Sequence, residues 1–560
     1  MSLKPSCQEQ NKIIKISSVL RNYKKLNNQA PLLCVAVLIF LLGLTYFTFA
    51  NDTRFCGDSF VSGDLADARV LVPFLADDTA SASICGFIFS GLTKIDKDLH
   101  VIGDLAESWD ISEDKKVITF YLKKNIFWHD KTPFTANDVK FTFEQILDPQ
   151  NKSPYGSNYK NIEKIEIVDP YTVRFYYSVA YAPALSKLGV GIIPEHICKN
   201  KKYSDFSDSP VGTGPYIFKK WLKNQFIMLS ANSIYYEHIP FIQQYISRTI
   251  PDQSVQFLEL LSGGIDQASL TPDQYFYRTN QKVFRQNFNI YKYLSLGYTY
   301  MGYNLKDELF ADKRVRQALS YAIDKKRIIQ GVLLGLGEEC SGPFSKNSEY
   351  YNNNAETYSY NKEKAMQLLN ESGWHDINGD GILEKNGKKF RFTLITNQGN
   401  KTREDIAVLV QEDLAKIGVK VDVRTIAWSA FLNEFIDKRK FQAVILGWSI
   451  PIDPDCYSVW HSDNIGGNGL NFVSYKNEKV DELIKKGRET FNTDMRARIY
   501  QEIHSLIADD APYTFLFVPY ATVSISKRFR GIAVEKSGIY YNFIDWYVMP
   551  DEQKFNFINK

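Results

Sequence analysis

The sequence has few residues of the kinds that build catalytic and metal sites. Its seven histidines lie far apart, with no H-E-x-x-H motif and no pair at the helical spacing of metal ligands. It has no G-x-S-x-G turn of a serine hydrolase, and its seven cysteines follow no metal-site spacing. We therefore expect no catalytic residue, no metal ligand and no cofactor.

The chain also lacks an excess of charge of one sign. Residues 1–30 hold six basic residues and one acidic residue, a net charge of +5, so the rest carries +3 − 5 = −2. This near-neutral balance argues against nucleic acid as a partner. A chain of 560 residues is too long for one core and predicts two or three domains.

No charged residue occurs between Pro31 and Ala50. At about 1.5 Å per residue, a helix of this run would span the roughly 30 Å of bilayer hydrocarbon. The basic residues before it favour a cytoplasmic N-terminus and an exported remainder. We expect an uncleaved membrane anchor. A signal peptide cleaved after Ala50 is the alternative, and a lipoprotein at Cys56 is disfavoured because Arg54 and Phe55 precede it.

Residues 106–139 have the most informative pattern. Residues 117–122 alternate as a half-buried strand does, and the polar turn at 113–116 lets residues 108–111 pair back as a hairpin. Thr135 or Asn137 can cap a helix that continues through Ile146.

This segment resembles the signature block of the extracellular solute-binding proteins of peptide and nickel ABC importers, family 5. There, a Trp, a polar turn, an aromatic-rich strand, a His-Asp turn and a T-A-x-D-V helix follow in this order. Lys131 departs from the pattern, which has Gly at that turn. The run V-R-Q-A-L-S-Y-A-I-D at 315–324 is a second specific match, and V-G-T-G-P-Y at 211–216 and G-G-I-D at 263–266 are weaker ones.

The resemblance implies an α/β, two-lobed periplasmic-binding-protein-like fold (type II, cluster C) with an extra sub-domain inserted in the first lobe, plus the N-terminal transmembrane helix. The expected division is a basic cytoplasmic tail (1–30), the anchor or signal segment (31–50), the first lobe (57–95, then 207–303), its inserted sub-domain (96–206), the second lobe (304–516), and a return to the first lobe with the C-terminal tail (517–560).

The residues themselves predict a βαβ unit in the second lobe. A strand at 390–396 leads to a helix that Thr402 caps and Gly418 ends, and strands at 419–423 and 441–446 flank a second helix at 428–437. Ligands bind at the carboxyl ends of such strands.

The loop from Gly447 to Asp455 follows the last of these strands. It resembles the family's Gly-Trp loop, whose Trp and neighbours line the ligand pocket, so the resemblance implies that Trp448, Ser449 and Ile450 bind ligand. Many peptide-binding members carry an Asp three residues after the Trp, which pairs with the peptide's α-amine. That position is Pro451 here, and whether Asp453 replaces it stays open, as does a purely structural role for the loop.

Further candidate ligand residues come from three segments. The resemblance places the loop before the helix at residues 84–92 in the cleft, and Thr79 or Ser81 can cap that helix. Trp428 and Trp460 could stack on a flexible ligand, although a core position is the alternative for Trp428. Asn471 matches the family's N-x-x-x-Y pattern. The further candidate ligand-binding residues are therefore Asp78, Thr79, Ala80, Ser81, Trp428, Trp460 and Asn471.

The implied function is that of the substrate-binding protein of an ABC importer. Two lobes would close over an oligopeptide, a similar extended solute or another small molecule at the outer face of the cytoplasmic membrane, and present it to permease subunits driven by a cytoplasmic ATPase. The chain itself would do no chemistry. A membrane-anchored sensor or adaptor with the same fold is the alternative, and a secreted hydrolase is disfavoured by the absent motifs.

Overall fold

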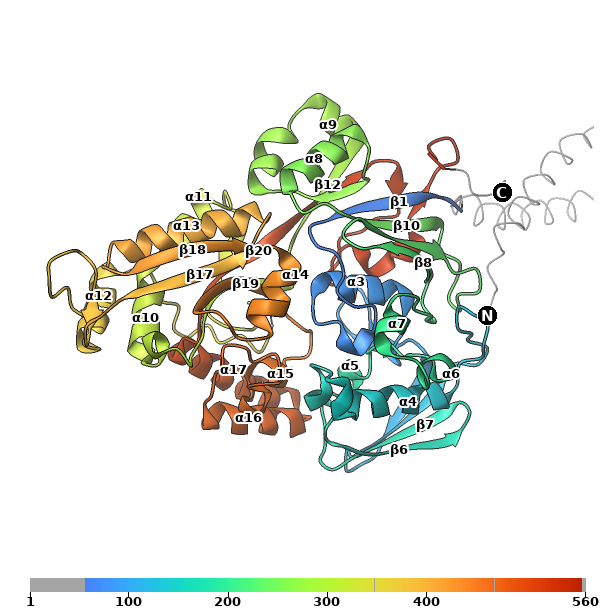
Figure 1. Cartoon of the computed structure of the whole chain (residues 1–560). Coiled ribbons are helices and arrows are strands. Elements are labelled where there is room, and N and C mark those ends of the chain that lie inside the picture. Colours follow the sequence, from blue (N-terminus) through green and yellow to red (C-terminus); the bar gives the residue numbers. More distant parts are fainter. Residues whose placement is uncertain (1–55, 347, 468, 556–560) are drawn as a thin grey trace, which may run out of the picture.

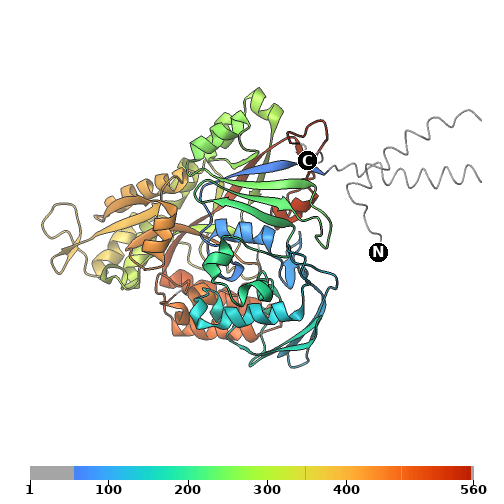
Figure 2. The same ribbon diagram turned by 45° about the vertical axis from the view of Figure 1, so that its right-hand side comes forward.

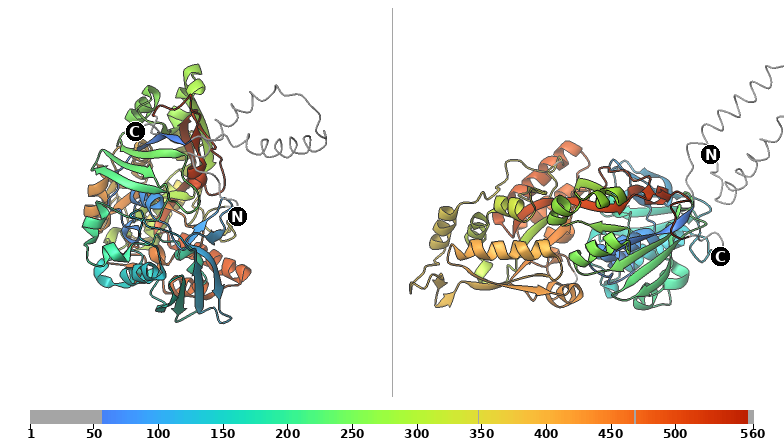
Figure 3. Two further views of the ribbon diagram at one scale, coloured as in Figure 1. Left: turned by 90° about the vertical axis from the view of Figure 1, so that its right-hand side faces the viewer. Right: turned by 90° about the horizontal axis from the view of Figure 1, so that it is seen from above.

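The computed structural model describes residues 56–346, 348–467 and 469–555 (Figure 1). They form two α/β lobes, which lie side by side in the view of Figure 1 and at the two ends of the molecule when it is seen from above (Figure 3). The predicted membrane span at residues 31–50 lies outside the described residues. Within the described ranges, no helix is both long and apolar enough to cross a membrane.

One twelve-stranded sheet continues through both lobes. Its first-lobe part is built from β11 (Gln267–Ser269), β1 (Gly57–Asp64), β10 (Ile242–Thr249), β9 (Phe226–Ala231) and β8 (Tyr216–Leu222). Its second-lobe part is built from β18 (Lys420–Ile426), β17 (Arg391–Asn397), β19 (Ala443–Ser449) and β13 (Gly297–Tyr303).

Two adjacent strand runs connect the lobes. The first half of β20 (Tyr513–Ser526) pairs with β13 and β14 (Gly337–Glu339), and its second half pairs with β12 (Phe288–Leu294) and β11. β12 and β13 cross beside it in the opposite direction, and Ser295 between them donates its N–H to the carbonyl oxygen of Pro519 at 3.0 Å. Because the crossings are neighbours, they form the connection about which the lobes can rotate.

Helices cover both faces of the second-lobe sheet (Figure 2). Along β19, Ala443 and Ile445 lie in one apolar core, and Val444 and Leu446 lie in another. The first core is closed by α10 (Lys313–Ala322), α12 (Lys362–Glu371) and α13 (Lys401–Ala415), and the second by α16 (Glu478–Glu489) and α17 (Thr493–Asp510). β17 pairs in parallel with β18 and β19, so the predicted βαβ unit is confirmed.

The helix caps were predicted with mixed success. Thr135 caps α4 (Ala136–Leu147), as predicted, in a capping box with Asp138. The prediction that Thr402 caps α13 is wrong, because the side chain of Asn400 accepts the N–H of Arg403 and Thr402 lies inside the helix. The prediction for α3 (Thr79–Ile88) is also wrong. Asp78 is the cap, with its carboxylate 3.0 Å from the N–H of Ser81, so both predicted caps lie inside the helix.

An antiparallel sheet of order β4-β5-β7-β6 lies within residues 96–206. Its strands are β4 (Ala106–Ile111), β5 (Val117–Leu122), β7 (Thr172–Tyr177) and β6 (Ile162–Asp169), and α4 packs on β6 and β7. The hairpin of β4 and β5 confirms the prediction.

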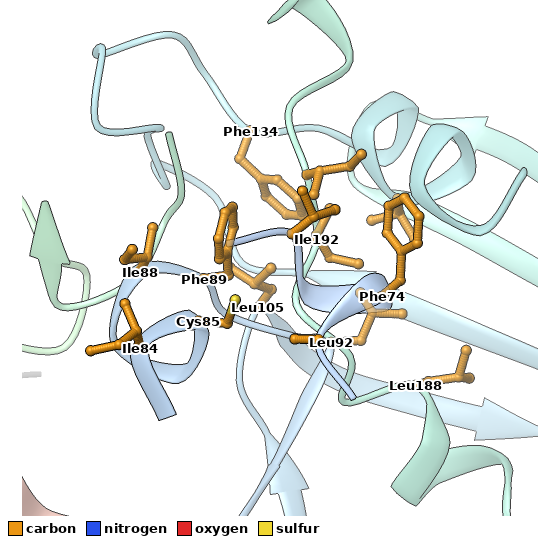
Figure 4. Packing of buried hydrophobic residues seen from close by; sticks show 14 of the residues in the cluster. Phe74, Ile84, Cys85, Ile88, Phe89, Leu92, Leu105, Phe134, Leu188 and Ile192 are labelled. Carbon is orange, nitrogen blue, oxygen red and sulfur yellow. The ribbon is translucent and has the colours of Figure 1, made fainter. Parts of the chain in front are cut away.

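The His-Asp turn ties this sheet to the first lobe. His129 donates its backbone N–H to the carbonyl oxygen of Gly212 at 2.9 Å, and its Nε2 lies 3.0 Å from that of Gly214. A side chain on Gly212 is excluded, since its Cβ would lie 1.9 Å from the carbonyl oxygen of Ile88. Figure 4 shows Ile88 in the buried core that this joint covers, with Phe89 and Phe134 nearby. Two of the family blocks therefore form a structural joint.

Candidate functional site

A cavity of about 1670 Å³ lies between the lobes. The first lobe lines it with the start of α3 and the segment before it. The second lobe lines it with α14 (Trp428–Ala430), the π-helix η7 (Phe431–Ile436) and the end of β19 with the loop that follows. α3 and α14 face each other across the gap between the lobes in Figure 1. The volume exceeds the 300–1,000 Å³ that is usual for sites of drug-sized molecules.

Most of the predicted ligand residues lie on this cavity. Its lining includes Asp78, Thr79, Trp428, Trp448, Ser449, Ile450, Asp453 and Trp460. The predicted residues that the structure does not place on the lining are Ala80, Ser81 and Asn471.

Ser81 and Asn471 have internal partners instead. The Ser81 hydroxyl accepts the N–H of Arg69 at 2.8 Å and donates to the Asp78 carboxylate at 2.5 Å. The Asn471 amide donates to the carbonyl oxygen of Tyr475 at 2.8 Å and accepts that residue's N–H at 2.9 Å. Both side chains are buried, so they hold the loops that carry the lining.

Aromatic rings dominate the second-lobe wall. Trp448 stacks on Phe472 with 5.7 Å between ring centroids and donates its indole N–H to the hydroxyl of Tyr513 at 3.1 Å. Trp428 stacks on Phe431, also with nearly parallel rings. Within the part of the chain that the structure describes, the buried indole N–H of Trp428 has no hydrogen-bond partner.

Asp453 is neutralised by a neighbour from its own lobe. Its two carboxylate oxygens each lie 2.8 Å from a guanidinium nitrogen of Arg496, on α17. This bidentate geometry is the strong form of such a pair. The carboxylate is therefore occupied and does not stand ready for a ligand's α-amine.

Sequence patterns did not indicate the charged group on the first-lobe wall. Arg69 contacts Asp77 at 3.1 Å within its own lobe and Asp437, which follows η7 in the second lobe, at 2.7 Å. All three residues line the cavity. Burial, with smaller contributions from Asp437 and Asp78, raises the pKa of Asp77 to about 6 against the attraction of Arg69. Asp77 stands next to a predicted residue, but Arg69 follows no helix or motif that could have indicated it.

His, Cys, Asp and Glu side chains of the described ranges do not gather into a group of three that could hold a metal ion. The expectation of no resident metal stays a prediction.

Comparison with known proteins gives the family. Residues 100–469 match the family described as bacterial extracellular solute-binding proteins, family 5. The oligopeptide-binding protein AppA of Bacillus subtilis is 36% identical over 505 residues, covering 88% of this chain and 92% of AppA.

Solved structures agree with this match. AppA from Bacillus subtilis in complex with a nonapeptide has a TM-score of 0.84 at 36% identity, over 89% of this chain and 100% of that one. NikZ from Campylobacter jejuni in complex with Ni(L-His) has a TM-score of 0.80 at 30% identity, over 88% and 99%. DppA from Helicobacter pylori in complex with the peptide STSA also reaches 0.80, at 27% identity, over 89% and 99%.

The family consists of binding proteins and not of enzymes, and the two lobes with a cavity between them fit that role. The chain belongs to the family 5 extracellular solute-binding proteins.

Proposed function

We propose that this protein is the substrate-binding protein of an ABC importer that captures oligopeptides or similar extended solutes outside the cytoplasmic membrane. The lobes close over the solute and deliver it to permease subunits, and a cytoplasmic ATPase drives its transport. We do not propose the sensor or adaptor alternative, because AppA is named as an oligopeptide-binding protein and DppA as an ABC transporter-associated periplasmic binding protein.

The size and chemistry of the cavity carry this proposal. A volume of about 1670 Å³ leaves room for more than a dipeptide, and AppA, of similar fold, was solved with a nonapeptide. Aromatic walls suit a chain of variable side chains, because they gain contact area with little dependence on ligand sequence. NikZ was solved with a nickel–histidine complex, so a small chelate is the second ligand class to test.

We propose that ligand contacts come from the lining residues Asp78, Thr79, Trp428, Trp448, Ser449, Ile450 and Trp460. Trp428 would contact the ligand through its ring, because its indole nitrogen is buried. Asp453 is proposed to shape the loop through Arg496 instead of binding a ligand amine.

We also propose that Pro31–Ala50 is an uncleaved anchor and that the predicted division into lobes and inserted sub-domain holds. The strand crossings near Ser295 and Pro519 support two lobes. Peptide mapping of the membrane fraction tests the anchor: peptides from residues 1–30 should be present, and a mature chain that begins at Asn51 would contradict it.

Mass spectrometry of co-purified solutes tests the function. The full chain is purified without refolding and denatured, and the released molecules are identified. We expect peptides longer than three residues. Release of single amino acids, of metal chelates alone or of nothing would contradict the proposed ligand class.

A further inference from the structure

The lobes also touch beside the cavity, where the inserted sub-domain meets α16. Arg488 of α16 places its guanidinium between two rings, 4.8 Å from the ring centre of Tyr181 in the sub-domain and 4.1 Å from that of Tyr457 in the second lobe. Its Nη2 donates to the Tyr181 hydroxyl at 2.9 Å. The backbone crosses too, since Ala182 donates its N–H to the carbonyl oxygen of Arg488 at 2.7 Å.

Asp455 is the anion shared by both sides of this contact. Its carboxylate lies 3.6 Å from Nζ of Lys187, in the sub-domain, and 3.5 Å from Nε of Arg488, and its side chain is 0% exposed. The Tyr181 hydroxyl lies 3.4 Å from the same carboxylate. Burial opposes the charge, but Lys187 and Arg488 outweigh it and hold the pKa of Asp455 below its usual value.

The contact is coupled to the cavity through one loop. Asp455 stands at the end of the loop that begins with Trp448 and Ser449 on the cavity wall. Asp453 in the same loop holds Arg496, whose Nε donates to the carbonyl oxygen of Gly487, next to Arg488. A movement of the cavity wall therefore moves the carboxylate that joins the lobes.

We propose that Tyr181, Lys187, Asp455 and Arg488 form an interlobe latch that holds the lobes closed over a bound solute and slows its release. The inference rests on the proposed function. Tyr181 and Arg488 do not line the cavity and are positioning residues, whereas Lys187 and Asp455 also line it.

The distribution of the four latch residues between the lobes allows the latch to open without leaving a buried charge unpaired. When the lobes separate, Tyr181 and Lys187 leave with the sub-domain, while Arg488 stays with Asp455 in the second lobe. The buried carboxylate therefore keeps one cation, which avoids the large penalty of an uncompensated charge. Removing both sub-domain partners should weaken closure while leaving each lobe intact.

A more exposed ion pair between the lobes shows why burial matters for the latch. Lys160 lies 2.8 Å from Asp463, but their side chains are 43% and 50% exposed. Water and salt screen such a pair, so it contributes little to closure.

The test compares the full chain with the double variant Tyr181→Phe, Lys187→Met. Both substitutions keep side-chain size and remove only the hydroxyl and the ammonium that reach Asp455. Tyr203→Phe with Lys199→Met is the matched control, because these residues have the same chemistry within the sub-domain, bonded to Gln145 and Glu195.

Hydrogen–deuterium exchange of the protein as purified, with the solute that it retains, reports on closure through the amide of Ala182, which bonds across the lobes. We expect peptides that cover residues 179–183 to exchange about tenfold faster in the double variant and unchanged in the control. Exchange at the wild-type rate in the double variant would overturn the latch, whatever the ligand.

Release kinetics give the functional readout. A random nonapeptide library is loaded and its dissociation is followed by mass spectrometry. We expect release to be about tenfold faster in the double variant, with a smaller change in association, as for a contact that is buried when formed. Unchanged release would contradict the latch. Because Lys187 also lines the cavity, faster release supports the latch only together with faster exchange at Ala182. If the wild type retains no peptide, the proposed ligand class fails, and the exchange experiment still decides the latch.

Discussion

The two walls of the cavity differ in chemistry. The tryptophans of the lining, Trp428, Trp448 and Trp460, all belong to the second lobe, although that wall also carries Asp437 and Asp455. The first-lobe wall presents the pair of Arg69 and Asp77 besides two tyrosines, Tyr155 and Tyr159. Aromatic rings bind a ligand through apolar contact area and stacking, and these interactions depend little on the ligand's sequence. Charges respond to pH and to the charge of the ligand. We therefore expect the tryptophans of the second lobe to contribute most of the affinity, and Arg69 and Asp77 of the first lobe to make it depend on pH.

Trp448→Ala tests the aromatic wall and should have the largest effect. Removing a central ring from a desolvated site typically costs about 3 kcal/mol of binding, which is roughly a hundredfold in Kd. Calorimetry with a peptide identified by mass spectrometry measures it. Trp109→Ala, in β4 outside the cavity, controls for general loss of stability. Unchanged affinity in the Trp448 variant would remove this residue from the site.

Asp77→Asn tests the charged wall through pH. Native Asp77 keeps its proton up to about pH 6, whereas the unfolded chain releases it near the ordinary value of 3.8. Because the native state binds more protons in this window, the wild-type free energy of unfolding falls as pH rises from about 4 to about 6. Asn cannot ionise, so the free energy of unfolding of the variant does not fall in this way. The variant should be more stable than wild type by about 2 kcal/mol at pH 7.

Urea unfolding at pH 4, 5.5 and 7 measures the Asp77 effect. At pH 4 the two proteins should have nearly equal stability, because Asp77 is then protonated in the native wild type. A constant difference across the three pH values would show that Asp77 does not titrate in this window.

Asp437→Asn removes the second-lobe partner of Arg69 and should have a smaller effect. The Asp437 side chain is 42% exposed, so the lost ion pair contributes about 0.5 to 1 kcal/mol to closure. Solute dissociation should accelerate only a few-fold, and less at high salt. An effect as large as that of the latch double variant would reverse our ranking of exposed and buried contacts.

Lys131→Gly should leave both walls unchanged and raise stability slightly. Lys131 occupies the turn position where the family pattern has Gly, and its φ of 73° is in the left-handed region that glycine adopts without strain. We expect a gain of about 0.5 kcal/mol in thermal or urea unfolding. Peptide affinity should not change, and a loss of affinity would mean that this turn communicates with the cavity.

Patterns local in the chain were the ones that sequence predicted well. The β4–β5 hairpin, the Thr135 cap and the parallel pairing of β17 depend on periodicity and on neighbouring residues. The failures at α3 and α13 are also local. Each of these helices has a second residue of a capping type just after the true cap, Thr79 or Ser81 after Asp78 and Thr402 after Asn400. The helix begins at or before the residue that was predicted to cap it.

The site was less accessible to sequence, because its contacts join distant segments. The spacing around Asp453 could not reveal that Arg496, 43 residues later, occupies its carboxylate. Likewise, the match of Asn471 to a family pattern could not distinguish a ligand amide from one that holds its own loop. Arg69 meets Asp437 only because the lobes come together.

Hydrogen–deuterium exchange with and without the co-purified solute tests the central claim, enclosure by two lobes, most directly. We predict slower exchange on binding in residues 67–83 of the first lobe and in residues 447–460 of the second, together. Protection confined to one lobe, or none at saturating solute, would contradict enclosure between the lobes.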